Sequence, residues 1–510
     1  MIDFGPWLPD LPSLNHPGVA QLTNGFPAIR GFTAVPSAST VTQAKQSTGS
    51  PAADSNMPTI IGMHSTLTIS GNTITPQTFV GTDTRLLKLD SGTKKFSQFT
   101  TSDPTYTAIP RWRFVEFATT GGTRYVYAAG GTSVDLQRFE VDGNSAPETV
   151  PNGNVPNPTH LAVVGRFLVC GNTANSEAEV RWSSIDDGNN WTIGTNQADA
   201  QIIADASEVT GLVGGETGLV LTREGLYRLN YVGAPLVFTF DKVSNRGCEF
   251  AGSVASRSAD EVYFLSEDGF HRYAGGAVQN IGAQRVNDFF FSDFDRARAS
   301  DITCVIDPAR SLVIWSYGST NASGENDSLI AYDYVLDRWG FARLQHQTVG
   351  TLRQLGTTLE SLNTDAAGNA QTLDDLILSL DSPTYAGGTS SLAVAQTTDA
   401  GSVIATLTGA PLDLTLQTGE FEPAETQYAM IRGIYPHIDA NGNTTTVSCA
   451  VGSRTRQTDQ LSFAAAASVN SSNVIPARKS GRYFAARFTA SGDWDNAHGF
   501  SVDLTPQGRR

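Results

Sequence analysis

Short runs of apolar residues, each bounded by Gly, Asp or Asn, recur along the chain from about residue 57 to residue 346. The runs are rich in Val, Ile, Tyr, Phe and Thr, which favour β-strands. Two blocks, Gly218–Leu229 and Glu261–Tyr273, share a strand, a tight polar turn and a second strand. A similar block returns about every 45 residues, and repeats of this length with four short strands each are typical of a β-propeller. We therefore predict an all-β fold with a propeller of about six blades.

The pattern changes at both ends of the chain. The first 36 residues hold six prolines, at positions 6, 9, 12, 17, 27 and 36, and also many large apolar side chains. Proline disfavours helices and central strands, so we expect an extended arm in a groove of its own subunit or of a neighbour, followed by a linker. Thr-rich strands after residue 349 indicate a separate β-sandwich or β-barrel. The predicted division is an arm and linker (1–56), a propeller (57–348) and a C-terminal β domain (349–510), which the arm could complete.

One helix is predicted inside Arg285–Ala299, where Val286, Phe289, Phe290 and Phe294 recur at helical spacing. We expect it to pack on the rim of the propeller or on a neighbouring subunit.

The chain of 510 residues carries a net charge of −16, and only 16% of its residues are charged. Such acidity argues against a sequence-independent grip on nucleic acid, which needs clustered Lys and Arg. Between Arg353 and Arg432 there are ten carboxylates and no Lys or Arg. Three interpretations stay open for this stretch: a solvated face, a wall that repels a passing polyanion, or a Ca²⁺ site.

Signals for an enzyme are weak. The four cysteines form no C-x-x-C pair, the seven histidines have no zinc-binding spacing, and there is no G-x-S-x-G or Walker motif. We therefore expect no catalytic residues, metal or cofactor. A sialidase would need an arginine triad, but nothing in their spacing singles out three of the available arginines: Arg111, Arg113, Arg166, Arg181, Arg228 and Arg272. The N-terminus does not resemble a secretory signal, and no apolar run is long enough to span a bilayer.

Ser184–Trp191 matches S-x-D-x-G-x-x-W, the Asp-box pattern of sialidases and other propeller glycosidases. We predict a structural turn in which Asp186 bonds backbone groups, Gly188 takes a left-handed conformation, and Trp191 packs between sheets beside Ser184. This motif contains no catalytic group, so it supports the propeller and not an activity.

Both ends of the chain carry motifs of a known class of structural proteins. The motifs are Asp3–Pro12 (D-F-G-x-W-x-P-D), Asn15–Gly18 (N-P-G with His16 inserted), Arg30–Phe32, Leu373–Leu376, Ser379–Pro383, Ser480–Tyr483 and Gly508–Arg510. Together they resemble the tail nozzle, or tail tubular, proteins of short-tailed bacteriophages, a group that includes packaged-DNA stabilisation proteins. The resemblance covers both ends and the propeller-like middle.

This resemblance implies a homo-hexamer in the virion tail, assembled in the host cytoplasm below the portal and adaptor rings. The hexamer would continue the DNA ejection channel, retain packaged DNA, and dock tail fibres or spikes and a needle or plug. Genomic DNA would pass through the lumen without sequence-specific binding. Net negative charge suits such a lumen, because a basic lumen would trap DNA. The alternative is a sialidase-like propeller glycosidase or a carbohydrate-binding tail protein.

Two sets of residues follow as predicted sites. We expect Phe4, Trp7, Leu8 and Leu11 of the arm to lie in an interface with another subunit. We expect the acidic stretch to help line the channel, through Glu360, Asp365, Asp374, Asp375 and Asp381.

Overall fold

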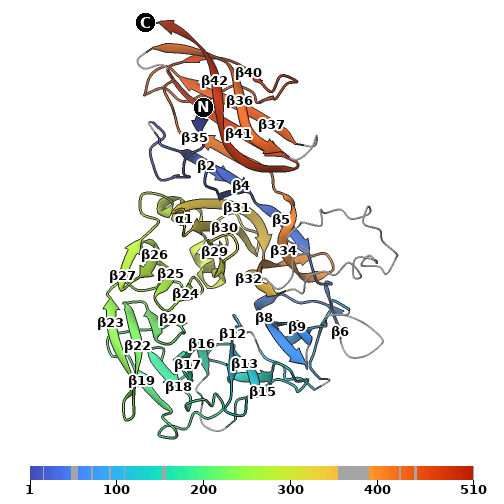
Figure 1. The fold of residues 1–510 in the computed structure, drawn as a ribbon, viewed down its shortest axis with the longest axis vertical. Coiled ribbons are helices and arrows are strands. Elements are labelled where there is room, and N and C mark those ends of the chain that lie inside the picture. The colour runs from blue at the N-terminus through green and yellow to red at the C-terminus, as the bar shows by residue number, and fades with distance from the viewer. Residues whose placement is uncertain are drawn as a thin grey trace.

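The computed structural model describes residues 1–14, 16–47, 55–70, 73–90, 93–100, 102–107, 109–151, 155, 157–353, 390–423, 427–440 and 445–508. Seven four-stranded β units stand around a central axis, and a β-sandwich lies beyond one side of this ring (Figure 1). The prediction of an all-β propeller with a further β domain is confirmed, and the described residues form seven blades where we counted about six.

Each of the first six blades is a consecutive meander of four strands. Blade one is β8 (Ile60–Ser70), β9 (Thr73–Thr82), β10 (Leu86–Leu89) and β11 (Phe96–Ser97), extended at its outer edge by β6 (Lys45–Ser47) and β7 (Ser55–Asn56). Blade two is β12 (Arg113–Ala118), β13 (Arg124–Ala129), β14 (Gln137–Glu140) and β15 (Glu148–Thr149). Blade three is β16 (Pro158–Val164), β17 (Phe167–Thr173), β18 (Glu179–Trp182) and β19 (Asp199–Ile202).

The next three blades follow the same order. Blade four is β20 (Val209–Val213), β21 (Gly218–Thr222), β22 (Leu226–Gly233) and β23 (Val237–Ser244). Blade five is β24 (Ala255–Ser258), β25 (Glu261–Ser266), β26 (Gly269–Ala274) and β27 (Ala277–Asn280). Blade six is β28 (Thr303–Asp307), β29 (Leu312–Tyr317), β30 (Asn326–Asp333) and β31 (Arg338–His346).

Strands in the middle of a blade are apolar on both sides because a neighbouring blade covers each face. Every residue of β17 and every residue of β29 is buried. Such strands read as continuous apolar runs rather than as an alternating pattern. This explains why the blades were visible in the sequence as short blocks of Val, Ile, Phe and Tyr.

The seventh blade is assembled from three distant parts of the chain. Its strands are β32 (Thr348–Arg353), β33 (Ser390–Thr398), β34 (Gly401–Pro411) and, on the outside, β5 (Pro36–Thr40). β5 pairs antiparallel with β34, so a strand from the N-terminal region completes the last blade. The domain boundaries predicted at residues 56 and 348 therefore do not coincide with the observed sheets. The sequence does not show blade seven, because its strands do not form one uninterrupted repeat of about 45 residues.

The C-terminal domain is a sandwich of two sheets. One sheet has the order β2 (Val19–Thr23), β35 (Leu414–Thr418), β41 (Tyr483–Ser491), β37 (Thr446–Arg454) and β38 (Ser462–Phe463), with β39 (Ala467–Ser468) also on β37. The other has the order β4 (Phe32–Ala34), β42 (Trp494–Gly508), β36 (Tyr428–Ala440) and β40 (Ile475–Gly481), with β1 (Ile2–Asp3) also on β42. Three of these strands, β1, β2 and β4, come from the first 34 residues.

One sheet runs through both domains. Strand β3 (Gly25–Pro27) pairs with β31 of blade six through Gly25 and Phe341, and it forms a hairpin with β4. β4 in turn pairs with β42 of the sandwich through Phe32 and Ala497. The result is a ten-stranded sheet that joins the propeller to the sandwich.

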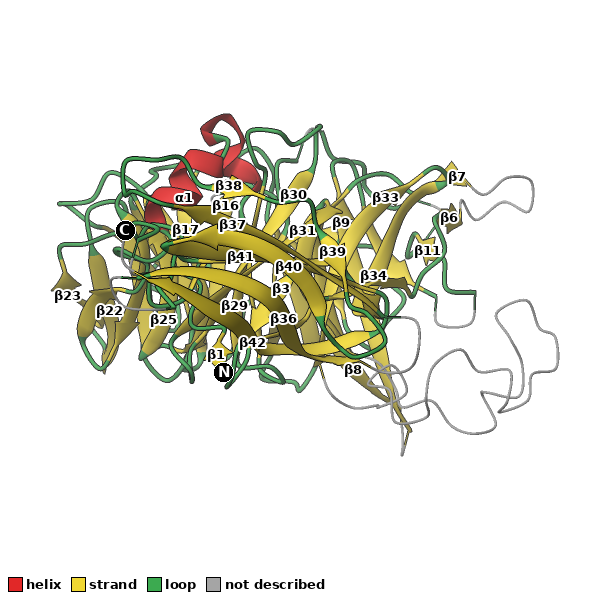
Figure 2. Cartoon of the chain, turned by 90° about the horizontal axis from the view of Figure 1, so that it is seen from above, coloured by secondary structure: helices red, strands yellow, loops and turns green. Residues whose placement is uncertain are grey.

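The predicted helix forms, but it is shorter than expected. Helix α1 spans Asn287–Asp293, and a 3₁₀ segment follows at Arg296–Asp301 (η1). Figure 2 shows both helical segments together at one edge of an otherwise β structure. The helix ends because Phe294 adopts an extended backbone, which lets its ring stack on Phe290 in the core. This core is continuous from blades five and six into the sandwich.

Truncation of Trp7 to alanine is expected to destabilise the protein by about 3–5 kcal/mol, because the indole is 1% exposed within the core that joins the two domains. The measurement is the midpoint of chemical unfolding. The matched control is Ile29→Ala in the same arm, where the side chain is 80% exposed and the expected change is within about 0.5 kcal/mol. Equal effects of the two substitutions would contradict the burial of the arm.

Candidate functional site

The arm is held by aromatic contacts on both domains. The ring of Phe4 lies 5.2 Å from that of Phe488 in the sandwich. Trp7 lies 5.0 Å from Phe289 on α1 and 5.7 Å from Phe341 on blade six. Edge-to-face and tilted pairs at such distances stabilise beyond the area they bury. The Asp3–Pro12 motif therefore contacts the sandwich, helix α1 and blade six at the same time.

Asp10 of the arm supplies the cap that α1 lacks. The N-cap residue Val286 offers no side-chain acceptor. Instead, the carboxylate of Asp10 accepts hydrogen bonds from the backbone N–H groups of Asp288 (3.0 Å) and Phe289 (2.8 Å). An oxygen acceptor at the first turn satisfies N–H groups that have no partner within the helix. Burial nevertheless raises the pKa of Asp10 above its usual value.

The two N-terminal motifs pack directly against each other. A Cβ added to Gly5 would lie 2.5 Å from the carbonyl oxygen of Pro17, and one added to Gly18 would lie 2.1 Å from that of Pro6. The inserted His16 is accommodated because its Nδ1 accepts from the N–H of Gly18 (3.0 Å), while its Nε2 donates to a carbonyl of the arm, that of Leu8 (2.8 Å). The glycines are thus required for close approach of the backbone.

The structure corrects the expected contact with another subunit for Phe4 and Trp7, and for Leu8 and Leu11 that contact stays a prediction. Phe4 and Trp7 are 2% and 1% exposed inside their own chain, so neither has surface left for a neighbour. Leu8 and Leu11 are half-buried beside them. The physical reason is that the sandwich and the propeller of the same chain together form the groove that covers these rings.

The predicted channel-lining residues Glu360, Asp365, Asp374, Asp375 and Asp381 lie outside the described residues. Four later carboxylates of the same acidic stretch are described, Asp399, Asp413, Glu420 and Glu422, and the last two form ion pairs. Glu420, buried, contacts Arg454 at 2.6 Å and accepts from the hydroxyl of Ser13, and Glu422 contacts Arg482 at 2.6 Å. These two side chains are therefore structural.

The predicted turn at Ser184–Trp191 forms, but the roles of Asp186 and Gly188 both differ from the prediction. Asp186, and not Gly188, takes the left-handed conformation, with φ of +56°. Gly188 is needed for space instead, since an added Cβ would lie 2.6 Å from the hydroxyl of Tyr127 in blade two. The carboxylate of Asp186 binds Arg166 rather than backbone groups.

Trp191 and Ser184 of this turn are buried. The indole N–H of Trp191 donates to the carbonyl of Gly188 (2.7 Å), and the ring packs among side chains of blades two and three. The hydroxyl of Ser184 donates to the carbonyl of Thr195 (2.9 Å). The motif therefore stabilises the contact between two blades.

The six blade arginines do not form one cluster. Arg166, Arg228 and Arg272 pair with carboxylates at the surface, and Arg181 donates to the carbonyl of Trp191. Only Arg111 and Arg113 meet, at a cavity of about 330 Å³ lined by the innermost strands of all seven blades. This cavity lies in the central channel of the propeller.

A serine–histidine pair in blade six has the geometry of a nucleophile and a base. The Oγ of Ser316 lies 2.5 Å from the Nε2 of His346, whose Nδ1 donates to the carbonyl of Leu344 (2.7 Å). Asn326 also donates to Ser316 (2.9 Å). Both Ser316 and His346 are 0% exposed, so a substrate has no access to them. The pair is a buried polar network and not an active site.

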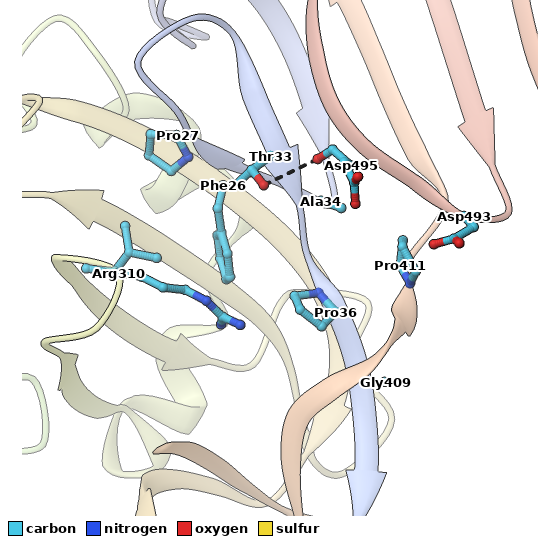
Figure 3. Close-up of a pocket in the computed structure, with 11 residues that line it drawn as sticks. Phe26, Pro27, Thr33, Ala34, Pro36, Arg310, Gly409, Pro411, Asp493 and Asp495 are labelled. Atoms are coloured by element: carbon cyan, nitrogen blue, oxygen red, sulfur yellow. Dashed lines mark hydrogen bonds between the residues drawn. The ribbon is translucent and has the colours of Figure 1, made fainter. Parts of the chain in front are cut away.

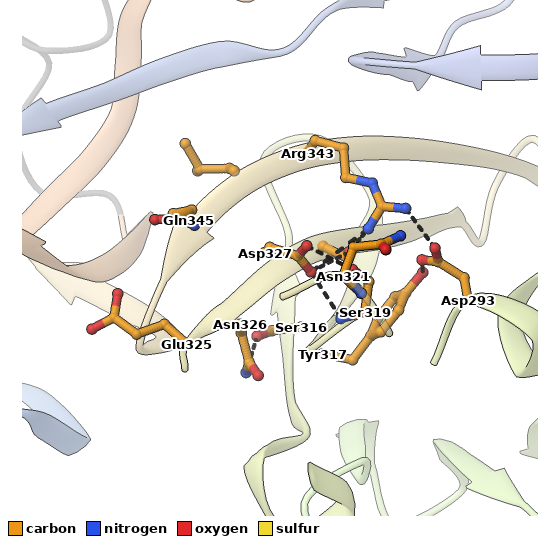
Figure 4. Close-up of polar contacts among 12 residues, drawn as sticks. Asp293, Ser316, Tyr317, Ser319, Asn321, Glu325, Asn326, Asp327, Arg343 and Gln345 are labelled. Carbon is orange, nitrogen blue, oxygen red and sulfur yellow. Dashed lines mark hydrogen bonds and ion pairs between the residues drawn. The ribbon is translucent and has the colours of Figure 1, made fainter. Parts of the chain in front are cut away.

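Two carboxylates beside this pair are also fully engaged (Figure 4). Arg343 donates to Asp293 at 2.6 Å, and Asp293 accepts from the hydroxyl of Tyr317 at 2.8 Å. Asp327 accepts from both the N–H and the hydroxyl of Ser319. These bonds fix the end of α1 to blade six, which leaves neither carboxylate available as a general base.

A crevice of about 470 Å³ separates blades six and seven from the sandwich (Figure 3). Its wall includes the side chains of Phe26, Pro36 and Arg310, and Asp493 and Asp495 contribute at its rim. Arg310 already donates to the carbonyl of Leu407 (3.2 Å) in the seventh blade. The crevice therefore lies between the two domains, and the guanidinium group of its Arg310 already has a hydrogen-bond partner.

The described part of the chain contains neither a candidate metal-binding cluster nor a candidate membrane-spanning helix. Its His, Cys, Asp and Glu side chains form no group of three or more that could hold a metal ion. None of its helices has the length and apolar character needed to cross a bilayer.

No known family model and no curated protein matches this chain. Among solved structures, it is similar to the dihydro-heme d1 dehydrogenase NirN (TM-score 0.34, 11% identity, covering 78% of this chain and 72% of that one). It is also similar to a putative 6-phosphogluconolactonase from Bacteroides uniformis ATCC 8492 (TM-score 0.32, 10% identity, 53% and 82%) and to hydrazine synthase from Kuenenia stuttgartiensis (TM-score 0.27, 11% identity, 45% and 65%). Likeness at this level carries no inference about function.

Acidification is expected to destabilise the protein through His346, because burial lowers the pKa of this imidazole to about 4. Between pH 6.5 and 4 the unfolded chain binds a proton at this residue and the folded chain does not, so stability falls as the pH is lowered. Full titration through this window costs roughly 3 kcal/mol.

The measurement is the unfolding midpoint at several pH values for wild type and His346→Gln. The variant is expected to be less stable at pH 7 and to lose less stability on acidification. Parallel pH curves would contradict the neutral, buried imidazole. His64, whose pKa is also lowered to about 4 by burial, titrates in both proteins and cancels in the comparison.

Proposed function

We propose that this protein is a structural subunit of the tail of a short-tailed bacteriophage, without catalytic residues of its own. In this proposal six copies form a nozzle below the portal and adaptor rings. The nozzle continues the DNA ejection channel, retains packaged DNA, and docks fibres or spikes and a needle or plug. The protein then belongs to the virion tail and is assembled in the host cytoplasm.

The observation that carries the proposal is the structural role of the motifs on which the resemblance rests. Phe4 of the first motif contacts the sandwich, Trp7 contacts α1 and blade six, Asp10 caps α1, and Gly18 of the second motif packs on the first. The motifs are therefore one unit that holds a propeller and a sandwich at a fixed angle. A subunit of a ring that guides DNA needs this kind of fixed geometry between its domains.

The hairpin of blade four offers a surface suited to contacts between subunits. Tyr231, Val232 and Leu236 at the tip of β22–β23 are 48%, 53% and 67% exposed. Large apolar side chains gathered at one exposed place are typical of interaction sites. The tip lies at the outer edge of the ring (Figure 1), where a neighbour or a fibre can reach it.

Charge agrees with a lumen for DNA. The net charge of −16 disfavours adhesion of a polyanion that must slide past. The alternative, a propeller glycosidase or carbohydrate-binding tail protein, draws support from the meeting of Arg111 and Arg113 alone. A sialidase uses a Tyr nucleophile and a carboxylate, and most other glycosidases use two carboxyl groups, but the described residues that line this cavity include no Tyr, Asp or Glu.

Negative-stain electron microscopy of the concentrated chain, alone and mixed with portal and adaptor rings, tests the proposal. Rings with sixfold symmetry and a central hole are expected. Monomers under both conditions would contradict it, and turnover of a fluorogenic glycoside would favour the alternative.

Leu236→Asp is expected to shift ring particles toward monomers, because it places a charge on the exposed hairpin tip. Mass photometry measures the distribution of oligomers. Val335→Asp is the matched control, since Val335 is 70% exposed on a turn of blade six, away from this hairpin. Equal ring fractions in the two variants would exclude the hairpin of blade four as the contact surface.

A further inference from the structure

Arg113 of blade two and Arg111, two residues before it, reach into the central channel of the propeller. Arg111 donates to the carbonyls of Ile302 and of Ser300, which precede blade six. Arg113 donates to the carbonyls of Thr159 at the start of blade three and of Ala251 before blade five, at 3.2 and 3.3 Å. Both guanidinium groups therefore lie inside the channel and not on the outer surface.

These two cations have no counter-ion in the cavity that they share. Among the described residues, neither Arg111 nor Arg113 forms an ion pair with a carboxylate, and the lining of the 330 Å³ cavity includes no Asp or Glu. Asp301 stands near Arg111, but its carboxylate is bound by Arg298 at 3.0 Å. Burial lowers the pKa of Arg111 to about 10 and that of Arg113 to about 9, and their mutual repulsion adds to the effect on Arg113.

Two further polar groups of the same lining lack a partner among the described residues. They are the Nε2 of His160, a residue 3% exposed, and the hydroxyl of Thr303, a residue 9% exposed. Buried polar atoms are nearly always hydrogen-bonded, so each unpartnered one calls for an explanation. Burial and the two arginines lower the pKa of His160 well below its usual value, so the imidazole is neutral and holds one N–H.

We propose that the channel cavity binds a small oxyanion, through a carboxylate or phosphate group held by Arg111, Arg113, His160 and Thr303. A guanidinium has five N–H donors, and each of these two uses only part of that set on carbonyls. Planar guanidinium groups suit the two oxygens of such an anion. The hydroxyl of Thr303 and the neutral imidazole of His160 provide further donors.

A purely structural role for the arginines explains less of the site. Cross-bracing accounts for their bonds to four carbonyls around the ring. It does not account for His160 and Thr303. If the arginines only connect the blades, the Nε2 of His160 and the hydroxyl of Thr303 stay buried without a hydrogen bond. An anion satisfies these two groups and the uncompensated charge together. The inference does not depend on the proposed role in a phage tail.

The test is isothermal titration of the full chain with inorganic phosphate and, separately, with citrate, at constant ionic strength. The expected result is saturable binding of at least one of them, with one site per chain. Phosphate alone would assign the ligand group as phosphate, and citrate alone would assign it as carboxylate. No saturable binding of either would overturn the proposal.

Three variants connect the binding to this cavity. Arg113→Gln is expected to weaken binding about tenfold or more. Thr303→Val keeps the shape of the side chain, so it is expected to weaken binding several-fold while leaving the melting temperature of the free protein unchanged or higher. Arg30→Gln, at an exposed arginine of the arm, is the control and is expected to bind as wild type does.

These outcomes distinguish a specific anion-binding site from non-specific attraction of anions to positive charge. If Arg30→Gln weakens binding as much as Arg113→Gln does, the proposal is wrong. If Thr303→Val folds normally and binds as tightly as wild type, the cavity is not the site. Because Thr303→Val adds no charge and removes no internal bond, this result is informative even if Arg113→Gln fails to fold.

Discussion

Backbone hydrogen bonding through one short hairpin sets the relation between the two domains. β3 continues the sheet of blade six, and β4 continues the sheet of the sandwich, so the ladder passes from one domain to the other without a flexible linker. A ladder has a fixed strand spacing and a fixed register, because a slip of one residue would turn every side chain to the wrong face. Phe26 and Phe32, both 1% exposed, hold that register by packing on opposite sides of the junction.

The first 40 residues therefore serve three parts of the molecule. β1, β2 and β4 complete the sandwich, β3 extends blade six, and β5 closes the seventh blade. Ring closure by a strand from the opposite end of the chain makes the propeller a cooperative unit, because its last blade cannot be completed until the N-terminal region is in place. Strand β4 ends at Ala34 and β5 begins at Pro36, so the chain passes from the sandwich to blade seven within two residues.

Buried polar groups fall into two kinds in this protein. Ser316, His346 and Asn326 satisfy one another, and Arg343 with Asp293 and Asp327 does the same beside α1. In the propeller channel, His160 and Thr303 are unpartnered and two guanidinium groups have no carboxylate. Satisfied networks stabilise a single structure, whereas unsatisfied ones are the places where a ligand gains most by binding. This contrast distinguishes the propeller channel, with its unsatisfied polar groups, from the satisfied networks elsewhere in the described structure.

Local pattern was sufficient to predict the fold class, the consecutive blades and the turn at Ser184–Trp191, because alternation of strand and turn is encoded within about 45 residues. The same reasoning placed a helix at Phe289 and Phe290 and recognised the arm as buried rather than disordered. The seventh blade was missed because its strands come from residues 36–40 and 348–411, and no local repeat joins them.

The partners of the arm and the meeting of Arg111 with Arg113, His160 and Thr303 were decided only by tertiary structure. Hydrophobicity shows that Phe4 and Trp7 must be buried, but not whether their own chain or a neighbour buries them. Closure of seven blades brings side chains from blades two, three and six to one axis, and that proximity has no trace in their spacing along the chain. The sequence by itself determined the strands, the turns and the need to bury the arm, since these follow from short-range chemistry. The ring, the shared sheet and the channel depend on contacts between distant segments, which only the folded chain brings together.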